Sequence, residues 1–548
     1  MNHANLEVQE ADGKTSVLDT AHAGDIKGAF GTIRRGDENR RRGWAARLNT
    51  LLAIAGPGLI VMVGDNDAGA FSTYAQAGQN YGTSLLWTLA LLVPVLYVNQ
   101  EMVLRLGAVT GVGHARLILE RFGKFWGAFS VIDLFVLNAL TIVTEFIGIG
   151  LGLDYLGLPK LPGVAVSALL VAAVVSTGSF RSFERFALAL VAGSLLLVPF
   201  FVFVHPPLDQ VVRDTLIPSY PAGAKLSEVM LLIIAIVGTT VAPWQLFFQQ
   251  SYVIDKRITP RFIRYQRADL LIGIVIVVGG GIAIMAGAAA AFAGRPEFGN
   301  FADTLAVSMG IAKYYGKLPA ALFSIALIDA CLIGATAVSL STAYAIGDVF
   351  TLKHSLHRKP TDAIGFYTIY FALIVLAAAL VLIPHAPLGL LTNAVQTLAG
   401  VLLPSASVFL LLLCNDKAVL GPWINSRRVN IFTSLVVGVL VILSVVLTMS
   451  VIFPDLGERT IIVILAGGAV AGLLVGVAML LPRSKREEQA GHLDPLQRDS
   501  WRMPPLEQLE PAKLSPGYRF WMGVLRGYLI LASAMAIYKA IQMAFGHA

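Results

Sequence analysis

Long apolar runs alternate with short polar stretches along most of the chain. Each run is roughly 20 residues long, which is the length that an α-helix needs to cross a bilayer. The pattern therefore predicts about twelve transmembrane helices between residues 49 and 481. We place them at about 49–80, 84–107, 126–152, 163–178, 183–205, 227–254, 266–293, 318–352, 365–383, 388–414, 429–453 and 459–481.

The composition supports an all-α integral membrane protein. Hydrophobic residues make up 56% of the 548 residues, charged residues only 14%, and the mean hydropathy is +0.72. A soluble protein would carry roughly 25% charged residues. The net charge of +7 does not indicate nucleic-acid binding, because the basic residues lie between apolar runs. Cys331 and Cys414 lie inside apolar runs, so the sequence predicts neither a disulfide framework nor a cysteine metal site.

The basic residues also predict an orientation. Every loop that joins an even-numbered helix to the next odd-numbered one is basic, and cytoplasmic loops are enriched in Lys and Arg. We therefore expect a multi-pass protein of the plasma or inner cell membrane with a cytoplasmic N-terminus. No cleavable signal peptide is predicted. The basic loop residues are Arg116, Arg121, Lys124, Arg181, Arg185, Lys256, Arg257, Arg261, Arg264, Lys353, Arg358, Lys359, Lys417, Arg427 and Arg428.

The polar regions divide the chain further. We predict a cytoplasmic N-terminal tail at 1–48, the transmembrane domain at 49–481, a charged cytoplasmic linker at 482–518 and an apolar C-terminal helix at 519–548. Lys539 lies well inside that last segment, which favours a helix docked on the membrane surface over a thirteenth span.

The first apolar helix is interrupted by Asp65, Asn66 and Asp67, which lie between Gly64 and Gly69. A carboxylate inside the membrane costs at least about 2.5–3.5 kcal/mol, so two of them indicate a function. On an intact helix residues 65 and 67 would point about 200° apart. Unwinding at the two glycines would let both carboxylates approach one site.

The sixth helix carries a second interruption. Gly238, Thr239 and Thr240 precede Ala242-Pro243, and a proline cannot donate a hydrogen bond to the preceding turn. A proline alone would indicate only a kink, and the acidic triplet alone a helix end. Two broken helices five apart are typical of transporters built from inverted repeats, in which freed carbonyls and half-helix ends coordinate ions. The combination predicts a cation site at the two breaks.

These segments resemble one known family. Gly56-Pro57-Gly58, Asp67-Ala68-Gly69-Ala70-Phe71, Ala242-Pro243-Trp244-Gln245 and Gln396 with Leu403-Pro404 are similar to motifs of the NRAMP divalent-metal transporters, over about residues 50–480. The resemblance implies a LeuT-type fold, with inverted five-helix repeats at about 49–205 and 227–414 plus extra C-terminal helices. It also implies secondary-active transport of metals such as manganese or iron, coupled to protons, by alternating access.

The expected metal site departs from the family pattern. By resemblance its ligands fall on Asp67, Ala70, Ala242 and Gln396, so an asparagine oxygen and a methionine sulfur are replaced by alanine. Asp65, Asn66, Thr239 and Thr240 are candidates for compensating oxygens. Because thioethers favour soft metals and oxygen ligands favour hard ones, we expect Mg²⁺ or Mn²⁺ as substrate. The magnesium-transporting branch of NRAMP-related proteins likewise lacks the methionine.

The expected proton pathway is also reduced. Trp244 replaces the histidine of the family's sixth helix, and its pair of acids in the third helix becomes Ile142 and Glu145. Glu145 and Asp329 remain as candidate proton carriers. We therefore predict weak proton coupling or none, with protons left open as a second partner.

Two other functions stay open: transport of an organic solute such as an amino acid, and a membrane sensor that transports nothing. An enzyme is not predicted, because no nucleophile–base set, Walker motif or metal-hydrolase spacing occurs. No cofactor is expected beyond the metal as substrate. The direction of transport and the oligomeric state are not determined by these patterns.

Overall fold

The computed structural model describes residues 17–383 apart from 38 and 40, then 395, 399, 406–453, 457–480, 495–512, 519, 522–531 and 534. Two predictions lie outside these residues: Gln396 as a ligand and the first part of the tenth helix. Whether the 519–548 segment spans the membrane stays a prediction as well.

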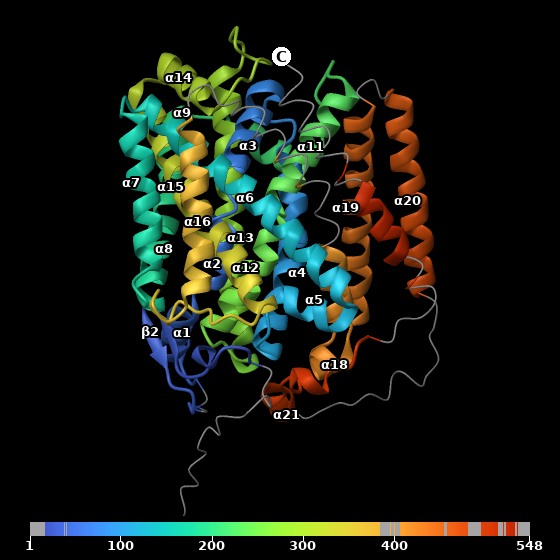
Figure 1. Ribbon diagram of the computed structural model, residues 1–548. Coiled ribbons are helices and arrows are strands. Elements are labelled where there is room, and N and C mark those ends of the chain that lie inside the picture. Colours follow the sequence, from blue (N-terminus) through green and yellow to red (C-terminus); the bar gives the residue numbers. More distant parts are fainter. Residues whose placement is uncertain are drawn as a thin grey trace, which may run out of the picture.

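The chain is a bundle of long helices (Figure 1). Every predicted span has a helical counterpart, although the tenth is described only at residues 395, 399 and 406–414. Within the described residues eight helices are long and apolar enough to cross a membrane, or ten if two bent pairs each count as one span. The helices of the spans are α1 (Trp44–Ile54), α2 (Pro57–Val63), α3 (Ala68–Tyr81), α4 (Leu86–Thr110), α6 (Lys124–Tyr155), α7 (Lys160–Val175), α8 (Phe180–Gly193), α9 (Leu197–Val204), α11 (Leu226–Thr240), α12 (Pro243–Asp255), α13 (Ile263–Phe292), α15 (Lys317–Val349), α16 (Ile364–Val381), α19 (Arg427–Ile452) and α20 (Glu458–Leu480).

Both predicted breaks are present. The first helix stops at Val63 and resumes at Ala68, and the sixth stops at Thr240 and resumes at Pro243. The first helix has an additional bend of 54° between α1 and α2, which the apolar pattern did not predict. Its cause is local: Pro57 occupies the first turn of α2, and Gly56 takes a φ of 147° that L-residues rarely adopt.

The loops contain structure that the search for apolar runs missed. Short helices occur at α5 (His114–Phe122), α10 (Leu208–Leu216), α14 (Thr304–Tyr315), α18 (Lys417–Leu420) and α21 (Pro495–Ser500). These helices are too short or too polar to give a membrane signal.

The predicted N-terminal tail is also partly structured. A 3-10 turn, η1 (Thr20–His22), precedes an antiparallel hairpin of β1 (Ile26–Gly28) and β2 (Gly31–Ile33), in which Ile26 pairs with Ile33. Ile26 and Ile33 are buried, so the hairpin is packed against the bundle.

The first broken helix is fixed against α13 by close backbone contact. A Cβ at Gly58 would lie 2.5 Å from the Leu270 backbone nitrogen, and a Cβ at Gly273 would lie 2.8 Å from the Gly58 carbonyl oxygen. The Asp269 carboxylate accepts hydrogen bonds from the Gly56 and Gly58 backbone N–H groups, at 3.1 and 2.6 Å. The lower half of the broken helix is therefore firmly held next to the break.

Candidate functional site

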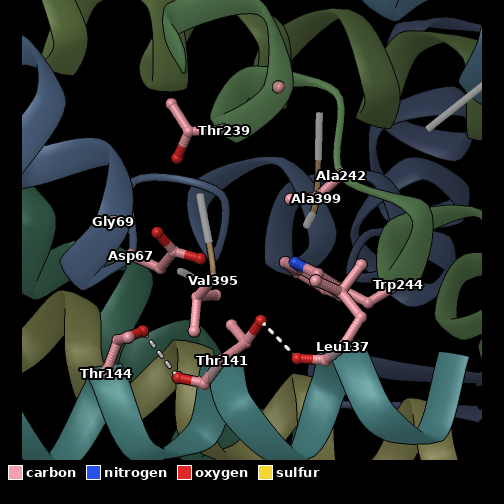
Figure 2. Close-up of a pocket in the computed structure, with 11 residues that line it drawn as sticks. Asp67, Gly69, Leu137, Thr141, Thr144, Thr239, Ala242, Trp244, Val395 and Ala399 are labelled. Atoms are coloured by element: carbon pink, nitrogen blue, oxygen red, sulfur yellow. Dashed lines mark hydrogen bonds between the residues drawn. The ribbon is translucent and has the colours of Figure 1, made fainter. Parts of the chain in front are cut away.

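A small pocket, with a cavity volume of about 20 Å³, lies between the two breaks (Figure 2). Asp67 enters it from the first broken helix, Thr239 and Ala242 from the sixth, and α6 forms a third wall. The other lining residues are Gly69, Leu137, Thr141, Thr144, Gly238, Trp244, Val395 and Ala399.

Asp67 is oriented by the start of α3. It is the N-cap residue, and its Oδ1 accepts a hydrogen bond from the Ala70 backbone N–H at 3.0 Å. This cap satisfies a backbone donor that the first turn of any helix leaves unpaired. The Asp67 side chain is thus held at the mouth of the break, with its carboxylate facing the pocket.

Glu145 lies next to Asp67, as the second acid of the site. Its side chain is fully buried, and its Oε2 accepts from the Ala68 backbone N–H at 3.1 Å. The neighbouring helix α15 leaves room for it at Gly334, where a Cβ would lie 2.7 Å from the Glu145 Cδ atom. Glu145 therefore places a second carboxyl group beside the N-terminus of α3, one residue from Asp67.

Thr141 and Thr144 line the pocket but were not among the predicted residues. Their hydroxyls donate to the Leu137 and Thr141 carbonyls of their own helix, at 2.9 and 2.7 Å, as Figure 2 shows. Because the protons are used in this way, the hydroxyl oxygens present only lone pairs to the pocket. The helical spacing of Thr141 and Thr144 with Glu145 is the sequence signal that could have identified them.

The helix ends at the breaks favour a cation. α2 and α11 both end at a break, and the C-terminal end of a helix carries partial negative charge and free carbonyls. The N-terminus of α3 has the opposite polarity, but Asp67 and Glu145 accept its N–H groups. The carboxyl oxygens of Asp67 and Glu145 therefore cap the positive end of α3 beside the pocket.

Asp65 does not join Asp67 in the pocket lining. Instead its Oδ1 accepts a hydrogen bond from Gln245 Nε2, and Gln245 Oε1 accepts from Gln100 Nε2 at 2.8 Å. The Asp65 side chain is fully buried. The chain of contacts Gln100–Gln245–Asp65 ties α4 and the start of α12 to the break in the first helix.

Replacing Gln245 by Leu is expected to destabilise the protein, because it removes the donor to a fully buried carboxylate. The cost of leaving such a group unsatisfied is about 1–3 kcal/mol, which a thermal unfolding curve of the purified protein would detect. Gln249→Leu is the matched control, since the Gln249 side-chain amide is buried one turn further along without a hydrogen bond in the described structure. Equal melting temperatures for the two variants would contradict this role of Gln245.

The other predicted residues lie in different places. Asn66 turns away from the pocket lining and donates to the Val277 carbonyl of α13 at 3.1 Å. Ala70 is fully buried within the first turn of α3 and does not line the pocket. Thr240 bonds to Tyr74 at 2.7 Å. Asp329 lies against Gly193 at the end of α8, where a Cβ would be 2.3 Å from Asp329 Oδ1.

The sequence profile of the family described as "Natural resistance-associated macrophage protein-like" (Nramp) matches residues 58–450. The chain belongs to the Nramp family. Its long helices, with matching breaks in the first and sixth spans, have the LeuT-type fold of two inverted five-helix repeats with further C-terminal helices.

Among the relatives is the divalent metal cation transporter MntH of Ralstonia nicotianae, which is 30% identical over 399 residues, or 69% of this chain and 86% of that protein. The Bacillus subtilis protein of the same name is 26% identical, with 72% and 92% covered. The crystal structure of the Eremococcus coleocola manganese transporter, in complex with an aromatic bis-isothiourea substituted compound, matches this Nramp protein with a TM-score of 0.62 and 20% identity. The structural match covers 81% of this chain and 97% of the manganese transporter chain.

Proposed function

We propose that this Nramp protein is a secondary-active transporter of divalent metal cations, with hard ions such as Mn²⁺ or Mg²⁺ as substrates. The relatives from Ralstonia nicotianae and Bacillus subtilis are named as divalent metal cation transporters, which supports this class of substrate. The pocket supports the preference for hard ions, and the two breaks support alternating access around it.

The observation that carries the proposal is the chemistry of the lining. Asp67 contributes a carboxylate and Thr141, Thr144 and Thr239 contribute hydroxyl oxygens, whereas the lining residues that the structure describes include no Met, Cys or His. Oxygen ligands suit hard cations, and Mg²⁺ in particular keeps several waters and binds through one or two carboxylates. A pocket with few direct ligands fits an ion that retains part of its hydration shell, and therefore low affinity.

The orientation that we propose places the N-terminus in the cytoplasm and the chain in the plasma or inner cell membrane. The basic residues that follow α7, α12 and α15 contact the N-terminal segment, which places these loops on one face of the bundle. This is the distribution expected from the enrichment of Lys and Arg in cytoplasmic loops.

The two alternative functions make different predictions for binding. An amino acid or another solute with a carboxylate would bring that group next to Asp67 and Glu145, which disfavours it electrostatically. Calorimetry of the purified protein with Mn²⁺ and Mg²⁺, with Asp67→Ala as control, separates the possibilities. Metal binding that is lost in the variant supports the proposal, whereas no binding to either protein would favour an organic solute or a sensor.

We expect weak proton coupling or none. Trp244 lines the pocket at the position where the family resemblance implies a histidine, and Asp329 packs against Gly193 of α8. A proton released from Asp67 or Glu145 when metal binds would therefore have no chain of side chains to carry it away. The measurement is the lumenal pH of proteoliposomes, followed with a trapped dye during metal uptake. Robust acidification that Glu145→Gln abolishes would contradict this expectation.

A further inference from the structure

The N-terminal segment from residue 17 to residue 37, which we call the N-terminal clamp, binds to the first repeat of the bundle. Its hairpin packs on α1, because a Cβ at Gly31 would lie 3.0 Å from the Ala53 Cβ. The clamp's Ala29 N–H donates to Glu184 Oε2 at 2.5 Å, and the Ala29 carbonyl accepts from Arg185 Nε at 3.1 Å. Both partners lie on α8. Arg181 of the same helix donates to the Gly28 carbonyl at 3.0 Å.

The same clamp binds the second repeat. Arg257, directly after α12, donates to the Ala21 carbonyl at 3.0 and 2.7 Å and to the Asp25 carbonyl at 3.1 Å. His22 Nε2 lies 3.4 Å from Asp255 Oδ1 at the end of α12. α12 is the half-helix that begins at the second break. The clamp therefore binds the opposite end of a helix whose first residues line the pocket.

The third attachment is an ion pair to the loop after α15. Asp19 accepts from Arg358 Nη2 at 2.7 Å and from the His354 backbone N–H at 2.9 Å. Although burial alone would raise it, these bonds and one from the Ala21 backbone hold the pKa of Asp19 at about 2. The pair is therefore ionised throughout the physiological range, and it ties the clamp to the second repeat with charge-assisted hydrogen bonds.

A second cavity lies between the metal pocket and the face that carries the clamp. It shares Leu137 with the pocket and continues along α6 to Ser130 and Phe129, towards the helix start at Lys124. Phe247 of α12 forms another wall. Movement of α12 away from α6 would widen this cavity into a path between the pocket and that face.

We propose that the N-terminal clamp is a latch that holds the two repeats together on this face and must release before the path from the pocket opens. The inference rests on the proposed transport function, because alternating access requires one repeat to move against the other. The clamp contacts α1 and α8 on one side and α12 and the loop after α15 on the other, so that movement breaks its contacts.

The test measures access to the second cavity with a reporter cysteine, Ser130→Cys, in the full-length purified protein. Both native cysteines are buried, so their labelling by a maleimide would report unfolding rather than opening. In the reporter protein the double variant Asp19→Ala with Arg257→Ala should label at least about tenfold faster, because it removes several charge-assisted hydrogen bonds and the loss of one such bond already corresponds to about tenfold. Arg34→Ala is the control, because this arginine is exposed in the same segment.

A more conservative substitution tests the latch in case the double variant does not fold. Asp19→Asn keeps the side-chain shape but replaces one acceptor oxygen by an NH2 group, which weakens the bonds from Arg358 and the His354 N–H, so it should raise the labelling rate by a smaller factor. If the reporter protein labels at the same rate with Asp19→Asn, with Arg34→Ala and with the unmodified clamp, the latch proposal is wrong. Because labelling needs no metal, this test does not depend on the identity of the substrate. If the double variant labels faster but the protein takes up no metal, the proposed transport function is wrong and the latch is still supported.

Discussion

Asp67→Ala is expected to abolish metal uptake while the protein still reaches the membrane and purifies as a folded species. The physical reason is that Asp67 supplies the carboxylate of the pocket lining, and the remaining oxygens there are neutral. A divalent cation that has given up part of its hydration needs this charge as compensation. Initial rates of Mn²⁺ uptake into proteoliposomes should fall at least about 100-fold, which corresponds to about 3 kcal/mol.

Two controls separate a lost ligand from a damaged fold. Asp67→Asn keeps the shape and a hydrogen-bond acceptor at the start of α3, so it should fold normally and still fail to transport. Asp154→Asn removes an exposed acid near the end of the third span, α6, and should leave uptake unchanged. Normal uptake by Asp67→Ala would remove Asp67 from the role of main ligand.

Ala242→Met combined with Ala70→Asn is expected to shift the preference of the transporter towards soft metals. Ala242 lines the pocket at the start of α12, so a methionine there would present a polarizable sulfur to the ion. Cd²⁺ uptake relative to Mn²⁺ should rise at least about tenfold, since one soft ligand is worth more than about 1.4 kcal/mol of discrimination. The measurement is competition between the two ions in proteoliposomes.

The single variants show how much each of the two positions contributes to the change in metal preference. Ala242→Leu adds similar bulk without sulfur and should slow all ions alike, without a change of preference. Ala70 is buried within the first turn of α3 and does not line the pocket, so Ala70→Asn alone should alter selectivity less than Ala242→Met. An unchanged ratio in Ala242→Met would show that this wall of the pocket does not approach the ion.

The sequence predicts the membrane-spanning part of the fold well, because long apolar runs and intramembrane acids are strong signals. The break at Asp67 and the break before Pro243 follow from local chemistry alone. The short helices α5, α10 and α14 and the N-terminal hairpin do not, because their stability comes from packing on the bundle. The hairpin strands are only three residues each, and Arg181, which donates to the Gly28 carbonyl, is distant in sequence. The residues before the hairpin likewise bind the distant Arg257 and Arg358.

The site is less predictable than the helices around it. Both aspartates at the first break were expected to approach one site, yet Asp65 bonds to Gln245 while Asp67 faces the pocket. Which way each side chain turns depends on contacts between helices that no local pattern encodes. Thr141 and Thr144 illustrate the same limit: threonines in an apolar helix are common, and only the position of α6 beside the breaks gives these two a role.

Transport of hard divalent cations through a pocket of oxygen ligands can be measured as the uptake of different ions into proteoliposomes that contain the unmodified protein. Initial rates for Mn²⁺, Mg²⁺ and Cd²⁺ at equal concentrations are the quantity to measure. We predict that Mn²⁺ or Mg²⁺ enters faster than Cd²⁺. Faster entry of Cd²⁺, or no entry of any of the three, would contradict it.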